Sequence, residues 1–214
     1  MSEICKNLHS LFNKLNRFSF PFEDSIIPRN GIYILFEKGE TAHKGDRIVR
    51  VGTHTGNNQL KPRLLQHFIN ENKDRSIFRK NIGRAILNRD HDLFLEQWQV
   101  DLTPRAQKEK FRGKIDMNKQ KEVERTVTNY MKENLSFVTL EITEKQKRLD
   151  LESKIISAIS LCDECKPSVN WLGLYSPVKK IRESGLWLVN GLYKQPLTET
   201  EFTELINSTQ KYEI

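Results

Sequence analysis

The sequence predicts an α+β fold, in which a small three-stranded antiparallel sheet is flanked by helices. Two β-rich segments, residues 31–37 and 47–53, are joined by a polar loop. Residues 136–142 (SFVTLEI) alternate between polar and apolar side chains and predict a third strand. A helical insertion of about 60 residues separates the second and third strands, and more helical patterns follow toward the C-terminus. The length of 214 residues suits one domain with an elaboration.

The first elements follow from local patterns. Residues 3–17 predict an amphipathic helix, because apolar side chains recur on one helical face. Residues 18–28 are a connector that contains proline and phenylalanine. After the two strands, residues 53–58 (THTGNN) predict a polar turn, and residues 60–71 predict a helix whose proline falls in the first turn.

The insertion is expected to be mostly helical. Residues 76–88 and 118–134 have apolar side chains at helical spacing. Residues 93–100 fit a short strand or a helix equally well, and residues 104–116 predict a polar, basic loop.

The C-terminal third continues with helices. Residues 144–161 predict a helix, and residues 167–177 predict a loop. Residues 181–193 are expected to form an apolar helix, and a capping box opens a last helix over about 198–208. We expect an N-terminal helix and connector (1–27), a central domain (28–175, insertion at about 74–135) and a helical extension (176–214).

Glu152 lies within an apolar helical stripe. Leu149, Ile155, Ile156 and Ile159 occupy the neighbouring positions on the same face. A buried, unpaired carboxylate costs several kcal/mol, so Glu152 needs water, a proton, a cation or a metal. From periodicity alone, an ion pair with an arginine at the edge of the stripe is sufficient to explain a carboxylate at this position.

Several residues occur in an order that carries a family signature. They are Gly31-Ile32-Tyr33, Val51-Gly52, Arg63, His67, Glu152 and Asn170. This order over residues 28–172 resembles the GIY-YIG nuclease family, and none of these residues would be a signal alone. The family implies a ββαβα core, which matches the predicted order of strands and helices.

The resemblance implies roles in metal-dependent hydrolysis of DNA. Tyr33 would position or deprotonate the attacking water, and Arg63 would hold the scissile phosphate. His67, one helical turn after Arg63, would relay a proton or bind phosphate. Glu152 would ligate Mg²⁺ (or Mn²⁺), and Asn170 would orient that group or the phosphate.

Two positions depart from the family pattern. Arg50 stands where the second motif usually has tyrosine, so it either brings a second cation to the phosphate or points to solvent. His54, in the turn after Gly52, is either an auxiliary proton donor or a loop residue without a role. Both departures bear on the hydrogen-bonding partner of Tyr33.

Charge points to a polyanionic partner. The chain has a net charge of +7 and a pI near 9.3, and residues 73–125 carry 14 Lys/Arg against 9 Asp/Glu. Such a segment attracts nucleic acid, although lysine-rich helices are often merely solvated. The expected DNA contacts are Lys108, Lys110, Arg112 and Lys114.

The three cysteines suit a reducing, cytoplasmic environment. Cys162 and Cys165 form a C-x-x-C, but no second Cys/His pair with ligand spacing accompanies it, and Cys5 stands alone. We therefore expect ordinary thiols that hold no metal. No segment is long enough to span a membrane, and the N-terminus does not predict a signal peptide.

The preferred function is a stand-alone endonuclease acting on DNA, in restriction or phage defence. One alternative is a DNA- or RNA-binding protein on a degenerate nuclease scaffold; another is a repair or recombination nuclease for branched or single-stranded DNA. One active site cuts one strand, so a homodimer or sequential nicking would be needed to cut both.

Overall fold

The computed structural model describes residues 2–23 and 26–209 and has an α+β fold. Its described part contains an antiparallel sheet of four strands in the order β1-β4-β2-β3. The strands are β1 (Phe18–Ser19), β2 (Gly31–Ala42), β3 (Gly45–Gly52) and β4 (Leu135–Glu141).

The predicted fold class is confirmed, but the prediction of three strands is wrong. The additional strand, β1, has only two residues, and they pair with Phe137 and Ser136 of β4. Two residues are too few to show the alternation by which a strand is recognised in sequence.

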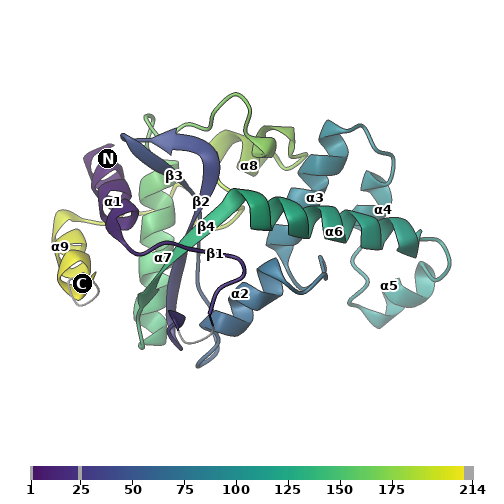
Figure 1. Cartoon of the computed structure of the whole chain (residues 1–214), viewed down its shortest axis with the longest axis horizontal. Helices are drawn as coiled ribbons and strands as arrows, with labels where there is room; N and C mark the ends of the chain where they lie inside the picture. The colour runs from purple at the N-terminus through teal and green to yellow at the C-terminus, as the bar shows by residue number, and fades with distance from the viewer. Residues whose placement is uncertain (1, 24–25, 210–214) are drawn as a thin grey trace.

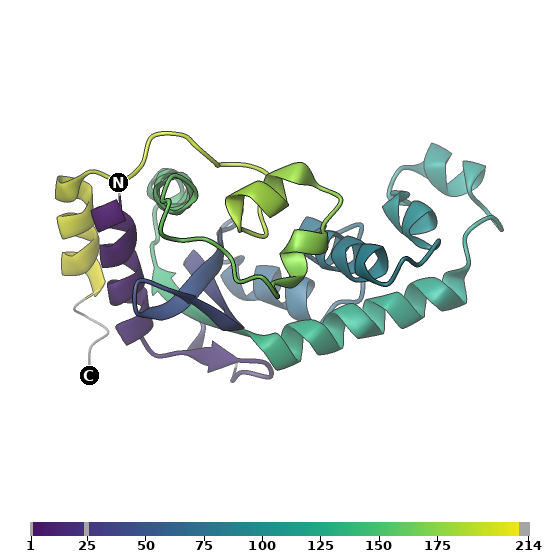
Figure 2. The same cartoon turned by 90° about the horizontal axis from the view of Figure 1, so that it is seen from above.

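Helices cover both faces of the sheet (Figures 1 and 2). The α-helices are α1 (Ser2–Lys14), α2 (Leu60–Phe68), α3 (Ile77–Arg89), α4 (Leu95–Gln99), α5 (Arg105–Lys110), α6 (Met117–Asn134), α7 (Lys145–Ser160), α8 (Lys179–Ser184) and α9 (Glu199–Thr209), with a 3₁₀ helix, η2, at Leu172–Tyr175.

The central strand β2 divides two cores. Ile32 and Ile34 face a core shared with α1, α7 and α9, whereas Tyr33 and Leu35 face a second core shared with α2, α3 and α6. Every residue from Gly31 to Glu37 is buried, because both faces are covered. This alternation directs Tyr33 toward α2, the helix that carries Arg63 and His67.

The insertion forms an arm that projects away from the sheet, with α6 along its length and α4 and α5 at its far end (Figures 1 and 2). Residues 93–100, whose pattern fits a short strand and a helix equally well, contain the helix α4. The loop predicted over 104–116 contains the helix α5, which begins after Pro104 and carries an i,i+4 ion pair between Arg105 and Glu109.

The apolar helix predicted over residues 181–193 is also wrong. Helix α8 ends at Ser184, because Gly185 takes a left-handed conformation with φ of +69°. The chain then lies along the edge of β3, where Trp187 N–H donates to Val49 O at 2.8 Å. Its apolar residues are therefore buried without helical structure.

None of the helices in the described part of the chain has both the length and the apolar character needed to cross a bilayer.

Candidate active site

Two glycines at one end of the sheet leave room for a neighbouring strand and for the Tyr33 side chain. A Cβ atom on Gly31 would lie 2.1 Å from Leu140 O, and a Cβ atom on Gly52 would lie 2.2 Å from the hydroxyl oxygen of Tyr33. Neither distance is tolerable for a side chain, so both motif positions require glycine. The hydroxyl of Tyr33 thus lies directly against the last residue of β3.

Tyr33 and His67 form a buried hydrogen-bonded pair. The Tyr33 hydroxyl oxygen lies 3.0 Å from His67 Nε2, and His67 Nδ1 lies 2.7 Å from Ser76 Oγ. Ser76 is also the N-cap of α3, where its hydroxyl accepts a hydrogen bond from Arg79 N–H. The start of α3 therefore fixes the imidazole orientation.

Burial keeps His67 neutral. Its pKa is lowered well below the usual value, first by desolvation and then by the charges of Arg50, Arg63 and Arg79. A neutral imidazole has one ring proton; when it lies on Nδ1, directed to Ser76, Nε2 accepts the hydrogen of the Tyr33 hydroxyl.

Arg50 points inward rather than to solvent. Its Nε lies 3.4 Å from the Tyr33 hydroxyl oxygen, its Nη1 donates to Trp187 O, and its guanidinium lies 4.6 Å from the centre of the Phe78 ring. Of the two alternatives from the sequence, the structure therefore places a second cation at the site, beside the tyrosine.

Glu152 projects from α7 toward the end of β3. Its Oε1 accepts a hydrogen bond from Thr53 N–H at 3.0 Å, and among the described residues it forms no ion pair. Burial is the largest influence on its pKa and raises it, while Arg50, the Thr53 N–H and Arg63 act in the opposite direction. The ion pair with an arginine that periodicity allowed is therefore not what accommodates this carboxylate.

Arg63 and Glu152 lie between two adjoining hollows. One, of about 730 Å³, is bounded by residues 53–56, by α2 and by Leu149. The other, of about 350 Å³, adds Arg50, Asn81 and the chain around Asn190. The Arg63 side chain is held by Gln66, whose Oε1 accepts from Nη1 at 2.7 Å. The two hollows together form the cleft. One carboxylate and two guanidinium groups line it, and Tyr33 and His67 are buried behind it.

His54 uses both ring nitrogens within the protein. Gly31 N–H donates to Nε2 at 3.2 Å, and Nδ1 lies 2.8 Å from Gly56 O. Because a carbonyl oxygen only accepts, Nδ1 carries the proton and the ring is neutral; burial also lowers its pKa. His54 therefore holds the loop after β3 in place at the edge of the cleft.

The structure does not bring Asn170 to this cleft. Asn170 is exposed and lines a different hollow, with Glu37, Arg89 and Tyr130. Asn190 lies at the cleft instead, next to Gly191, which has φ of +79°. The Asn-Gly dipeptide is a turn signal, and it was available in the sequence although the surrounding pattern was interpreted as helix.

Comparison with known proteins identifies the family of the chain. A family model described as the GIY-YIG domain matches residues 3–211, so the chain belongs to the GIY-YIG family. This membership confirms the resemblance and places the protein in a nuclease class. No curated protein and no solved structure matches the chain significantly.

Proposed function

We propose that this protein is a metal-dependent endonuclease that hydrolyses phosphodiester bonds in DNA, with a role in restriction or phage defence. The observation that supports the proposal most directly is the convergence of Glu152, Arg50 and Arg63 on one cleft, with Tyr33 and His67 behind them. These five residues come from β2, β3, α2 and α7, so only the folded chain unites them.

Glu152 fits a ligand for a divalent cation. Its Oε2 accepts no hydrogen bond among the described residues, while Oε1 is fixed by Thr53. Mg²⁺ is typically held by one or two carboxylates, with waters and phosphate oxygens completing the octahedron. When bound, such an ion would stabilise charge on the phosphate and lower the pKa of a water.

The remaining residues can bind phosphate and handle a proton. The Arg63 guanidinium presents a planar fork suited to two phosphate oxygens. Arg50 lies against the Tyr33 hydroxyl and stabilises negative charge on that oxygen, while neutral His67 Nε2 accepts its proton. Asn190 is positioned to orient phosphate, the role that the sequence suggested for Asn170.

The proposal is tested by incubating the purified protein with supercoiled plasmid and Mg²⁺ or Mn²⁺. We expect nicked circles to form, and EDTA to abolish their formation. Binding of the plasmid without cleavage in either metal would instead support the alternative of a nucleic-acid-binding protein.

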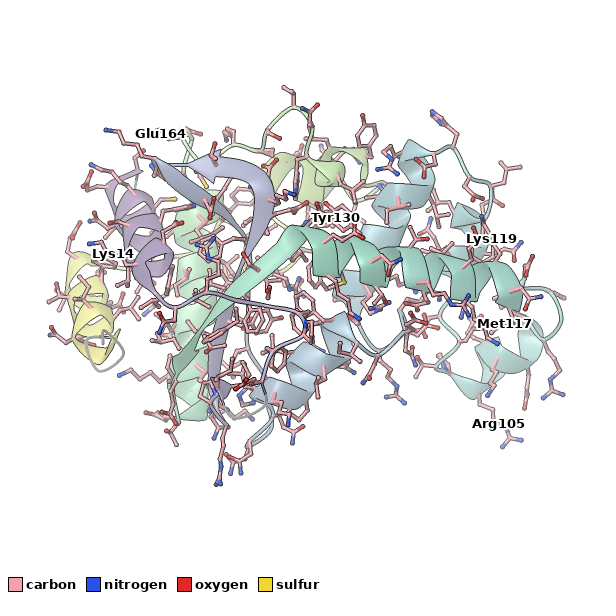
Figure 3. The ribbon with its side chains drawn as sticks, viewed as in Figure 1. Lys14, Arg105, Met117, Lys119, Tyr130 and Glu164 are labelled. Carbon is pink, nitrogen blue, oxygen red and sulfur yellow. The ribbon has the colours of Figure 1, made fainter. Side chains whose placement is uncertain are left out.

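The arm is expected to contact the DNA backbone. Four cations lie in α5 and the turn after it, and among the described residues none of them has a carboxylate partner: Lys108, Lys110, Arg112 and Lys114. Figure 3 labels Arg105, at the start of α5, at the far end of the arm. Replacing all four cations by alanine should weaken DNA binding and reduce the slope of log K against log salt by about 3 to 4, since each phosphate contact contributes about 0.9.

A matched control removes four exposed lysines outside the arm: Lys14, Lys38, Lys145 and Lys166. Both variants lose the same total charge, so a difference in slope reports local contact rather than net charge. Equal slopes for both variants and the parent protein would exclude α5 as a DNA contact.

A further inference from the structure

A second cluster of metal-ligating side chains lies away from the candidate active site. Cys5, His9, His43 and Cys165 are grouped so that one ligand atom of each lies within 4.8 Å of the others. The expectation that Cys5 is isolated and that the C-x-x-C thiols lack partners is therefore wrong. The partners were invisible in the sequence because they come from three separate segments, which only the fold brings together.

Each segment contributes by its own local geometry. Cys5 and His9 are four residues apart on α1, so they share a helix face. His43 lies in the two-residue turn between β2 and β3, and Cys165 follows α7 in a tight turn with Cys162. Figures 1 and 3 place the β2–β3 turn, the start of α1 and Glu164 at the same end of the molecule. Tyr33 lies at the opposite end of β2 from this turn, about 30 Å away along the strand at roughly 3.3 Å per residue.

The distances within the cluster suit a tetrahedral metal. Cys165 Sγ lies 3.6 Å from His9 Nε2, and one ligand atom of each of the four residues lies within 4.8 Å of the others. Cys162, whose Sγ lies 3.4 Å from His43 Nε2, is a neighbour of the cluster and not one of its four members. Around zinc, with bonds of about 2.3 Å to sulfur and about 2.0 Å to nitrogen, neighbouring S and N ligands are separated by about 3.5 Å.

His9 presents Nε2 to the thiol of Cys165, and both histidines have a partner near Nδ1. His9 Nδ1 lies 2.8 Å from Cys5 O, so it carries the proton and leaves Nε2 unprotonated. His43 Nδ1 lies 3.8 Å from Glu164 Oε2. A carbonyl or carboxylate behind the second ring nitrogen is the usual outer partner of a metal-binding histidine.

The backbone at His43 takes a left-handed conformation. His43 and Lys44 have φ of 51° and 66°, in a turn that favours Asn-Gly. Histidine is tolerated in the left-handed region better than most residues, and lysine is less suited to it, so this turn carries modest backbone strain.

We propose that Cys5, His9, His43 and Cys165 bind one zinc ion with a structural role. Two thiolates and two imidazoles are the ligands that zinc selects in closed, tetrahedral sites, and the buried cluster leaves no position for a substrate. The ion would join α1 to the end of α7, across 156 residues of chain, and fix the β2–β3 turn. Ile48 N–H donates to His9 Nε2 at 3.1 Å, a contact that a zinc ion at Nε2 would replace.

The test is the metal content of the full-length protein, purified under reducing conditions and dialysed. We expect one zinc per chain, and less than about a tenth of this in Cys165→Ser or His9→Gln. Cys162→Ser and Glu152→Gln are the controls and should keep their zinc, the second because it alters only the other site. Zinc lost from Cys162→Ser but retained in His9→Gln would overturn this ligand set.

Since ligand variants can fail to fold, the parent protein provides an independent measurement. Removing zinc with a chelator should lower the thermal unfolding midpoint by at least about 10 °C, and zinc should restore it. Reconstitution with Co²⁺ should give the absorption of a tetrahedral site with thiolate ligands. Protein that is folded, free of metal and unable to take up zinc or Co²⁺ would refute the proposal.

Discussion

Replacing Glu152 by glutamine is expected to reduce DNA cleavage by about 10³-fold or more while leaving the protein at least as stable as before. Loss of several kcal/mol of charge stabilisation at the phosphate accounts for the fall in rate, since each 1.36 kcal/mol is about tenfold. Stability should not fall, because Glu152 forms no ion pair in the described part of the chain and its amide would retain the contact with Thr53 N–H through oxygen.

The pH dependence of stability has a definite sign at this position. Burial raises the pKa of Glu152, so the folded protein binds a proton more tightly there than the unfolded chain does. In metal-free protein this contribution is present at low pH and is lost as pH rises through the folded pKa. Glutamine removes the effect, so Glu152→Gln should equal or exceed the parent in stability at neutral pH.

Thermal unfolding with and without Mg²⁺ separates a metal ligand from a structural residue. The parent protein should be stabilised by Mg²⁺, and Glu152→Gln should not. Glu144→Gln is a matched control, because Glu144 is exposed at the start of the same helix and makes no capping hydrogen bond. A Glu152→Gln variant that melts much lower yet cleaves DNA at the parent rate per folded molecule would refute the metal-site assignment.

The parts of the site that could be predicted are those set by periodicity. Tyr33 faces α2 because side chains alternate along a strand, and Arg63 and His67 share a helix face because they are four residues apart. Glu152 was conspicuous because a carboxylate interrupts an apolar stripe. Each of these signals is local, and the family order combined them into one site.

The parts that could not be predicted depend on irregular chain or on distant contacts. Asn190 lies at the cleft at the end of a non-helical segment. The apolar residues of this segment have helical spacing, but the segment lies along the edge of β3. The direction of Arg50 depends on Trp187 O, 137 residues away. The Cys/His cluster combines residues that are separated by most of the chain, so no spacing rule along the sequence identifies it.

The lysines and arginines of the insertion fall into two groups, one buried and one exposed. Part of its Lys/Arg excess is buried: Arg79 contacts Glu124, and Lys73 and Lys80 contact Asp74. These cations stabilise the arm internally and are not available to DNA, whereas those of α5 are exposed. Counting charges along the sequence does not separate the two groups.

Replacing Arg79 by methionine is expected to destabilise the protein by about 3–5 kcal/mol, because it strands a buried carboxylate. Arg79 is fully buried, and its guanidinium donates to Glu124 Oε2 at 2.8 and 2.9 Å and to Thr128 Oγ1 at 2.8 Å. It also donates to His67 O at 3.0 Å, so it links the arm to the helix of the candidate site. Urea unfolding at pH 7 measures the loss.

The matched control is Arg89→Met, in the same helix α3. Arg89 pairs with Asp90 at the surface, where the arginine side chain is 45% exposed, so the loss should be at most about 1 kcal/mol. Equal losses in the two variants would show that the Arg79 network contributes no more than a surface pair.

Two further measurements identify the stranded charge as the cause. Burial already raises the pKa of Glu124, and Arg79 is the strongest influence that lowers it again. Without Arg79, the pKa of Glu124 rises further, and the folded protein takes up a proton there. The loss of unfolding free energy in Arg79→Met should therefore be full at high pH and shrink as pH falls through the raised pKa. The double variant Arg79→Met/Glu124→Leu should recover most of the loss, since a paired removal leaves no buried charge. A deficit independent of pH and unrelieved in the double variant would instead assign the effect of Arg79 to packing.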